Sequence, residues 1–245
     1  MHQLTQQLKS GKMEILEVPL PALNRGQILV RNHYSLISAG TEGKTVSDAR
    51  KGYVAKAVSR QKEVKMAIDL IKTQGLKSAL NIVMNKLEAP SPIGYSCAGE
   101  VIAVAEDIRD LNPGDLVACG GQGAWHADIV AVYRNLCVKL PPDTNLKHAA
   151  FTTVAAIALQ GIRQSEVQTG GNCVVTGLGL VGQLTVQLLN ASGIRTIGID
   201  LDESRVKLAI ESGAVYAWKR DQEGLEELVK EATGGYGTDA VIITA

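Results

Sequence analysis

The chain has 245 residues, no formal net charge and 45% hydrophobic residues, a length that suits one large domain or two small ones. The balanced charge gives no support for a nucleic-acid or membrane partner. The first residues, MHQLTQQLKSGKMEILEV, lack the apolar core of a signal peptide, and no apolar run approaches the roughly 20 residues that span a bilayer. The four cysteines form no C-x-x-C pair, so we expect a reduced, cytoplasmic protein.

Two regions of alternating apolar and polar residues predict an antiparallel first domain. Residues 13–36 carry this alternation around prolines and glycines, which indicates two short strands joined by a turn region from Pro19 to Gly26. Four further strands are predicted between residues 92 and 140, in the stretches GEVIAVAEDI, LNPGDLVAC and HADIVAVYRNLCVKLP. We therefore expect a small β-barrel-like unit within residues 1–146.

A helical pattern interrupts these strands over residues 44–88. Apolar residues recur there at helical spacing, first at Val64, Ile68 and Ile71 and again from Leu76 to Leu87. We expect two or three helices with a basic exposed face, formed by Lys51, Lys56, Arg60, Lys62, Lys65, Lys72 and Lys77. Such a face is either simply solvated or docks an anionic substrate or partner, and the sequence leaves both alternatives open.

From about Lys147 the pattern changes to alternating helices and strands. The small-residue stretch LKHAAFTTVAAIALQGI predicts a tightly packed helix. It is followed by a strand in NCVVT, a helix near 180–192, a strand in TIGID, helices from Glu203 and near 222–233, and a strand in DAVIIT. Such alternation is typical of a parallel sheet with crossover helices, so we expect an α/β domain over residues 147–245.

The strongest chemical signal lies in the stretch NCVVTGLGLVGQLTVQLLNASG. Gly177, Gly179 and Gly182 form G-x-G-x-x-G between an apolar strand and a helix, the context that dinucleotide binding requires. The glycines would allow a tight turn, close approach of a pyrophosphate and close helix–strand packing, while the helix N-terminus attracts the phosphates. The predicted cofactor loop comprises Gly177, Leu178, Gly179, Leu180, Val181 and Gly182. The alternative is a glycine-rich turn that binds no nucleotide.

Two further residues bear on the choice of cofactor. Asp200 ends the strand TIGID about 20 residues beyond the glycines, where a carboxylate accepts hydrogen bonds from the adenosine ribose hydroxyls and repels a 2′-phosphate. Arg205 lies nearby, but a basic residue this far into the next helix also occurs in NAD-binding proteins. The pair favours NAD over NADP.

The order of these features over residues 1–245 resembles the medium-chain dehydrogenase/reductase superfamily, the group of zinc-type alcohol dehydrogenases. A more specific resemblance is to the bi-domain oxidoreductases. It rests on the stretches SLISAGTE at 35–42, PIGYSCAGEV and NLCVKLP, together with the long basic insert. The resemblance implies a GroES-like β-barrel followed by a doubly wound Rossmann sheet, an NAD(P)-dependent oxidoreductase acting on an alcohol or carbonyl of a sugar derivative, and a homo-oligomer. Because the chain stops at the fourth Rossmann strand, the resemblance also implies a longer natural protein with a second dehydrogenase domain.

The superfamily's zinc ligands do not occur at the matching positions of this chain. The three ligand positions fall on Ser38, on Tyr95 and, in the small-residue helix, approximately on Ala155, and none of these is an ordinary zinc ligand. The four-cysteine lobe that holds a structural zinc in the superfamily is missing too. A replacement site would have to use His33, His126 and Glu42. Lone histidines in strands are more often structural, so we expect no zinc.

Without a metal, hydrogen-bond donors must stabilise the substrate oxygen while the cofactor carries the hydride. Thr41 occupies the position of the superfamily's proton-relay hydroxyl. Tyr95 replaces the histidine ligand, and a phenol is protonated at neutral pH and can donate to a developing alkoxide. The structural alternatives are a turn hydroxyl for Thr41 and a packed barrel residue for Tyr95. We interpret Cys97 as a buried free thiol rather than a nucleophile.

Two functional hypotheses remain open. The first is a zinc-independent, NAD(P)-dependent oxidoreductase with a small-molecule alcohol or carbonyl substrate. The second is a non-catalytic NAD-binding scaffold or sensor that serves a downstream dehydrogenase domain, which the loss of all three zinc ligands favours. Nucleic-acid binding through the insert is disfavoured, because the insert lacks interleaved aromatics and the net charge is zero.

Overall fold

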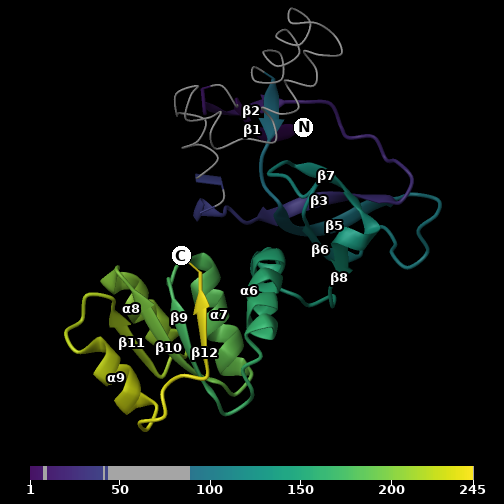
Figure 1. Ribbon diagram of the computed structural model, residues 1–245. Coiled ribbons are helices and arrows are strands. Elements are labelled where there is room, and N and C mark those ends of the chain that lie inside the picture. Colours follow the sequence, from purple (N-terminus) through teal and green to yellow (C-terminus); the bar gives the residue numbers. More distant parts are fainter. Residues whose placement is uncertain (8–9, 41, 44–88, 245) are drawn as a thin grey trace, which may run out of the picture. The chain divides into compact units, whose positions relative to one another are not determined.

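The computed structural model describes residues 1–7, 10–40, 42–43 and 89–244 (Figure 1). The chain forms two compact units, Met1–Phe151 and Thr152–Ala245. The predicted helices of residues 44–88, with their basic face, and the predicted catalytic residue Thr41 lie outside the described residues. No helix in the described parts of the chain is both long and apolar enough to cross a membrane.

A curled five-stranded antiparallel sheet forms the centre of the first unit, with the strand order β7-β3-β5-β6-β8. Its strands are β3 (Gln27–Ser35), β5 (Ser96–Val104), β6 (Leu116–Gly120), β7 (Ile129–Tyr133) and β8 (Cys137–Lys139), and the 3-10 helix η1 (Arg134–Leu136) joins the last two of these. The predicted antiparallel unit is confirmed.

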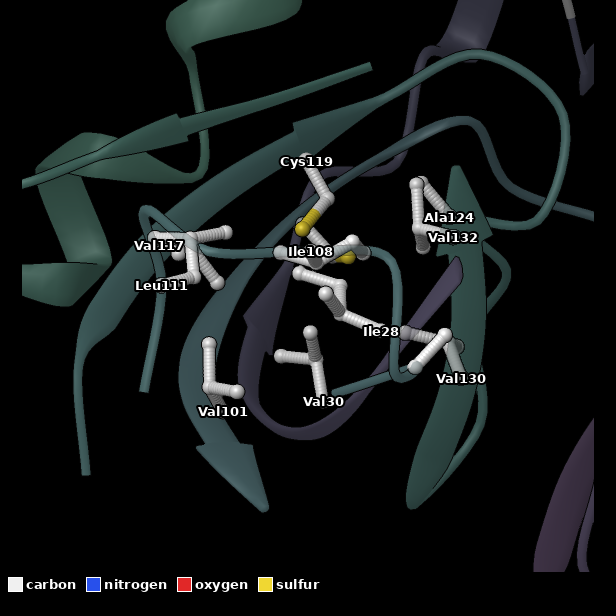
Figure 2. Packing of buried hydrophobic residues seen from close by; sticks show 12 residues of the cluster. Ile28, Val30, Val101, Ile108, Leu111, Val117, Cys119, Ala124, Val130 and Val132 are labelled. Carbon is white, nitrogen blue, oxygen red and sulfur yellow. The ribbon is translucent and has the colours of Figure 1, made fainter. Parts of the chain in front are cut away.

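The hydrophobic core of the first unit lies against this sheet. Figure 2 shows Ile28 and Val30 of β3, Val101 of β5, and Val130 and Val132 of β7 gathered into one cluster, and each of these side chains is at most 2% exposed. Burying a side chain of this size contributes about 1.5–3 kcal/mol relative to leaving it exposed. The period-two alternation seen in the sequence therefore decides which face of each strand turns inward.

A smaller sheet with the order β2-β1-β4 completes the strands of the first unit that the structure describes. It consists of β1 (His2–Gln7), β2 (Met13–Glu17) and β4 (Pro90–Pro92). The sequence did not predict β1, because HQLTQQ is too polar to show the alternation of a half-buried strand. Thr5 and Gln6 are nevertheless buried, and β1 pairs antiparallel with β2.

The first unit ends at Phe151, five residues later than the expected boundary at 146/147. The short helix α5 (Leu146–Ala149) begins at the expected boundary, because the Asn145 side chain accepts hydrogen bonds from two amides of the first turn of this helix. Ala150 then packs against small residues of the main sheet, and its carbonyl accepts a buried hydrogen bond of 2.6 Å from Ser96 Oγ. These contacts attach α5 to the first unit.

The second unit contains a four-stranded parallel sheet with the order β11-β10-β9-β12 (Figure 1). Its strands are β9 (Asn172–Thr176), β10 (Arg195–Asp200), β11 (Tyr216–Lys219) and β12 (Ala240–Ile243). Its helices are α6 (Thr152–Ser165), α7 (Leu180–Ala191), α8 (Glu203–Glu211) and α9 (Leu225–Ala232).

The helices cover both faces of the parallel sheet. One hydrophobic cluster joins the sheet to α6, α7 and α8 through Ile162, Val186 and Val206. A separate cluster joins Val174 and the other buried residues of the opposite face to α9. Helices on both faces of a parallel sheet define a doubly wound α/β domain, which confirms the predicted fold class.

The strand β11 is the one element of the second unit that the sequence did not predict. Its four residues, YAWK, are only partly buried, and β11 stands at one edge of the sheet. The rings of Tyr216 and Trp218 stack with their centroids 5.3 Å apart, which is the aromatic packing expected between side chains on one face of a strand. A short, half-exposed edge strand leaves little hydrophobic pattern in the sequence.

Candidate functional site

The turn between β9 and α7 adopts a geometry that requires glycine. Gly177 has a φ of 90°, in the left-handed region that favours glycine. A Cβ on Gly182 would stand 1.9 Å from the Gly177 carbonyl oxygen. Glycine at both positions therefore lets α7 begin directly against the carboxyl end of β9. The chain passes from β9 to β10 on one side of it and later returns to β12 on its other side, so the turn sits at the topological switch point where α/β sheets bind ligands.

The N-terminus of α7 is open around Gly179. Within the described parts of the chain, no atom lies within 4 Å of the position that a Gly179 Cβ would take. Gly179 is the N-cap residue, and the first turn, which starts with Leu180 and Val181, contains no acidic residue. The amides of a first helical turn have no acceptor within the helix, and the helix dipole places positive charge there. The predicted loop therefore fits a pyrophosphate.

Asp200 closes the other side of this loop from the end of β10. Its Oδ2 accepts a hydrogen bond of 2.5 Å from the Leu178 amide, and its Oδ1 accepts one of 2.9 Å from the Asp202 amide. Burial raises the pKa of Asp200, but the amides of Asp202 and Leu178 and the nearby guanidinium of Arg205 outweigh it, so the net pKa lies below its ordinary value. Asp200 is therefore a fixed carboxylate at neutral pH.

Two residues hold Asp200 and the glycine loop in register with α8. Arg205 Nη1 lies 3.7 Å from Asp200 Oδ2. Gln183, which sequence reasoning missed, is buried and donates from Nε2 to the carbonyls of Leu178, at 3.1 Å, and of Arg205, at 2.9 Å. The signal for Gln183 was an amide among the apolar residues of α7, next to Gly182. Gln183 thereby links the predicted cofactor loop to the helix that carries Arg205.

The first unit holds the predicted catalytic Tyr95 and the neighbouring position Ser38. Tyr95 is half-buried in the segment that precedes β5, and its carbonyl accepts a hydrogen bond of 2.9 Å from the Gly121 amide. Ser38 is buried, and its carbonyl accepts one of 2.8 Å from the Glu42 amide. The backbone bonds fix the chain at both residues. The role that we predict for the Tyr95 phenol stays a prediction.

A buried ionisable pair lies in the same unit. His126 Nε2 is 3.2 Å from Glu42 Oε1 and 3.3 Å from Oε2, and each residue is 8% exposed. His126 Nδ1 is 2.8 Å from the hydroxyl oxygen of Ser35, a residue at the exposed end of β3. A hydroxyl, an imidazole and a carboxylate are thus joined in series.

The backbone fixes the His126 ring in this place. The His126 amide donates to the Ile93 carbonyl at 2.9 Å, and its carbonyl accepts from the Leu4 amide at 2.8 Å. Gly94, with a φ of 103°, lies so close that a Cβ on it would stand 2.7 Å from the His126 nitrogen and 3.0 Å from its ring. Gly94, the first residue of the GYS stretch, is therefore required for His126 to pack here.

Comparisons with known proteins add to this geometry. The model of the zinc-binding dehydrogenase family matches residues 181–245. D-guloside 3-dehydrogenase of Escherichia coli is 30% identical over 62% of this chain and 44% of its own, and (R,R)-butanediol dehydrogenase of Bacillus subtilis is 28% identical over 60% and 50%. Mycobacterial Rv1454c, solved with NADPH, has a TM-score of 0.72 and 19% identity over 98% of this chain and 66% of its own.

These relatives belong to the medium-chain dehydrogenase/reductase superfamily, and the chain is similar to them in sequence and in fold. Its first unit has the GroES-like fold and its second unit the Rossmann fold. The chain spans about half the length of the curated relatives it matches.

The zinc positions of the superfamily are divided between the two units. Ser38 and Tyr95 belong to the GroES-like unit, and Ala155 lies in α6 of the Rossmann unit. Of the residues considered for a replacement site, Glu42 and His126 contact each other, whereas His33 is exposed on β3. Among the described residues, no cluster of three or more histidine, cysteine or acidic side chains could hold a metal ion. The expected absence of zinc stays a prediction.

Three of the cysteines lie side by side on adjacent strands. Cys97 pairs with Cys119, which pairs with Cys137, and the last two sulfur atoms are 3.7 Å apart. The thiol of Cys119 and burial raise the pKa of Cys137. Cys97 is fully buried, as expected for a structural thiol. Sequence reasoning missed the row, because antiparallel pairing joins positions that are 18 or more residues apart.

Proposed function

We propose that this chain carries the cofactor and substrate domains of an oxidoreductase that moves hydride between a nicotinamide cofactor and an alcohol or carbonyl. The observation that carries the proposal is the loop in which Gly179 leaves the N-terminus of α7 open while Asp200 stands at the end of the next strand. This arrangement accepts a dinucleotide pyrophosphate and the adjoining ribose. When bound, the nicotinamide supplies hydride transfer, and the protein orients the substrate.

The cofactor that we propose is NAD. Each Asp200 oxygen accepts one backbone amide and keeps a lone pair for a ribose hydroxyl. The same fixed negative charge would repel a 2′-phosphate. Arg205 is drawn toward Asp200, which leaves its guanidinium partly neutralised as a phosphate partner. The NADPH in the Rv1454c structure shows that a protein of this fold takes the other cofactor, so the choice has to be measured.

The substrate that we propose is a polyol or sugar derivative with neighbouring hydroxyl groups. The names of the two curated relatives, a guloside dehydrogenase and a butanediol dehydrogenase, support this class. We further propose a reaction independent of zinc, because the side chains of Ser38, Tyr95 and Ala155 are poor zinc ligands. The Tyr95 phenol would then donate a hydrogen bond to the substrate oxygen, aided by the Thr41 hydroxyl.

The cofactor is tested by titrating the full chain with NADH and with NADPH while nicotinamide fluorescence is followed. We expect NADH to bind at least tenfold more tightly than NADPH. Activity is then tested with NAD⁺ and a panel of (R,R)-2,3-butanediol, D-sorbitol and methyl glycosides, with and without EDTA. Turnover that survives EDTA supports the proposal. Turnover that EDTA abolishes and zinc restores would overturn the metal-independent part.

A second candidate function is an NAD-binding scaffold without turnover. The observation that favours it is the replacement of all three zinc ligands in a chain that keeps the glycine loop and Asp200. The same titrations separate the two functions, since a scaffold binds NADH and oxidises none of the panel. The predicted continuation into a second dehydrogenase domain, the homo-oligomer and the cytoplasmic location also remain proposals. The reading frame beyond Ala245 and the native mass of the protein test the first two.

A further inference from the structure

Two segments that are distant in the sequence, one with Ser35 and Glu42 and the other with His126, bring an acid–base series together in the GroES-like unit. Glu42 lies 84 residues from His126, and Ser35 lies 91 residues from it. The carboxylate and the imidazole are almost completely buried, whereas Ser35 is exposed. The series therefore leads from a surface hydroxyl to a buried charged group, and neither predicted site residue takes part in it.

We propose that Ser35, His126 and Glu42 form a proton relay that accepts the hydroxyl proton of the substrate during alcohol oxidation and returns it during carbonyl reduction. This inference rests on the proposed oxidoreductase function. His126 holds its neutral-state proton on Nε2 and donates it to Glu42. Nδ1 is then the free acceptor that faces the Ser35 hydroxyl.

The relay balances the proposed reaction. In oxidation, the carbinol C–H bond breaks and its electron pair moves as hydride to the oxidised nicotinamide. The O–H bond of the substrate breaks at the same centre, and its proton passes to Ser35 Oγ while the Ser35 proton passes to His126 Nδ1. The imidazolium that results faces the Glu42 carboxylate, which balances its charge in the buried site. The proton returns to solvent by the same path once the carbonyl product has left.

The position of the relay agrees with the predicted catalytic residues. Glu42 follows Thr41 directly in the chain, and Gly94, which packs against the His126 ring, directly precedes Tyr95. Two members of the relay therefore share a segment with Thr41, and the third, His126, packs against the residue that precedes Tyr95. Burying a carboxylate without a partner costs free energy. The described contacts of the Glu42 carboxylate are to the His126 imidazole, whose other ring nitrogen faces the exposed Ser35 hydroxyl.

The relay is tested on the full chain with Ser35→Ala, His126→Gln and Glu42→Gln, and with His148→Gln as a control for an exposed histidine of α5. NADH binding, which belongs to the other unit, should stay within twofold of wild type in all four. With the panel substrate that wild type oxidises best, we expect His126→Gln to lower kcat by about 100-fold or more, as loss of a general acid–base does. Ser35→Ala and Glu42→Gln should lower kcat by at least tenfold, with KM nearly unchanged.

Kinetic results can overturn the relay without overturning the proposed function. If wild type turns over and His126→Gln keeps its kcat within threefold, the reaction stands and the relay fails. If His126→Gln lowers only the urea midpoint of unfolding, the role of His126 is structural and the relay fails as well. A variant that does not fold is replaced by His126→Asn, which preserves the position of one ring nitrogen.

A spectroscopic measurement decides the relay even if wild type oxidises none of the panel. In ¹⁵N-labelled protein, the ring nitrogens of His126 are assigned by comparison with His126→Gln. We expect the neutral His126 ring to carry its proton on Nε2, toward Glu42, and to leave Nδ1 as the acceptor that faces Ser35. The His2 ring, which pairs with Asp128 at 3.1 Å, is assigned separately with His2→Gln. A neutral His126 ring that carries its proton on Nδ1 would overturn the relay.

Discussion

The backbone of Gly182 lies so close to Gly177 that a β-carbon on residue 182 would stand 1.9 Å from the carbonyl oxygen of Gly177 and 2.9 Å from its carbonyl carbon. Neither neighbour can move away, because both atoms belong to the turn that ends β9. The contact places the first turn of α7 against the sheet. It therefore sets the position of the amides that we propose as the pyrophosphate site.

We predict that Gly182→Ala and Gly179→Ala separate folding from cofactor binding. Gly182→Ala should destabilise the Rossmann unit by about 1–3 kcal/mol or more, because overpacking forces the backbone apart, and NADH binding should be lost with it. Gly179 has a φ of −70° and open space around it, so Gly179→Ala should fold normally. Its new methyl group would occupy the cradle and weaken NADH binding by about tenfold or more.

Urea unfolding followed by tryptophan fluorescence in a Trp125→Phe background, in which Trp218 is the remaining tryptophan, reports the stability of the Rossmann unit in both variants. Nicotinamide fluorescence reports binding. Equal NADH affinity in Gly179→Ala and wild type would contradict a pyrophosphate at this turn, whatever the stability of Gly182→Ala.

Asp200 should contribute to stability in a way that depends on pH. Its pKa in the folded protein is lowered from the ordinary value of 3.8. The carboxylate therefore stabilises the fold fully at pH values well above 3.8, and this contribution is lost as the pH falls below 3.8 and through the folded pKa. Asp200→Asn should lower the free energy of unfolding by about 1–3 kcal/mol at pH 7, as expected when a buried charged acceptor is removed. The difference between the two proteins should shrink below pH 4.

The measurement is a series of urea titrations from pH 7 to pH 3. Asp221→Asn is the matched control, because Asp221 is exposed and pairs only with the Lys219 ammonium among its described contacts. A stability difference between wild type and Asp200→Asn that stays constant over the whole series would contradict the depressed pKa.

The same substitution should change cofactor selectivity. Asp200→Asn removes the negative charge that we expect to repel a 2′-phosphate, while the amide oxygen can still accept a ribose hydroxyl. NADH affinity should fall modestly and NADPH affinity should rise. The dissociation constant of NADPH divided by that of NADH should therefore fall by about tenfold. Fluorescence titration with both cofactors measures this ratio. An unchanged ratio would place the ribose away from Asp200.

The features that the sequence predicted well are those with a local code. The G-x-G-x-x-G turn needs a glycine at 177 for its positive φ and at 182 for close approach, so spacing alone indicates the strand, the turn and the helix. Asp200 was equally predictable, because the end of the next parallel strand must lie beside that turn. The alternation in β3 likewise set its buried face.

The features that the sequence concealed depend on pairing between distant segments. The contact of His126 with Glu42 follows from the register of the curled sheet and from the missing side chain at Gly94. No periodicity carries that information. Polar β1 and the edge strand β11 were missed for a different reason, since neither turns a continuous apolar face to a core.

The buried thiols should report the unfolding of each unit separately. Cys97 and Cys119 lie in the core of the GroES-like unit, and Cys173 lies in that of the Rossmann unit. Burial raises the pKa of Cys173 to about 11, so at pH 8 roughly one molecule in a thousand carries the thiolate. In a pulse of iodoacetamide at increasing urea, analysed by peptide mass spectrometry, Cys97 and Cys119 should therefore become labelled together, and Cys173 at the midpoint of the Rossmann unit.

Gly182→Ala should lower the Cys173 midpoint and leave the other two unchanged. Rapid labelling of Cys173 without urea would contradict its burial, and a shift of all three thiols in Gly182→Ala would show that the units unfold as one.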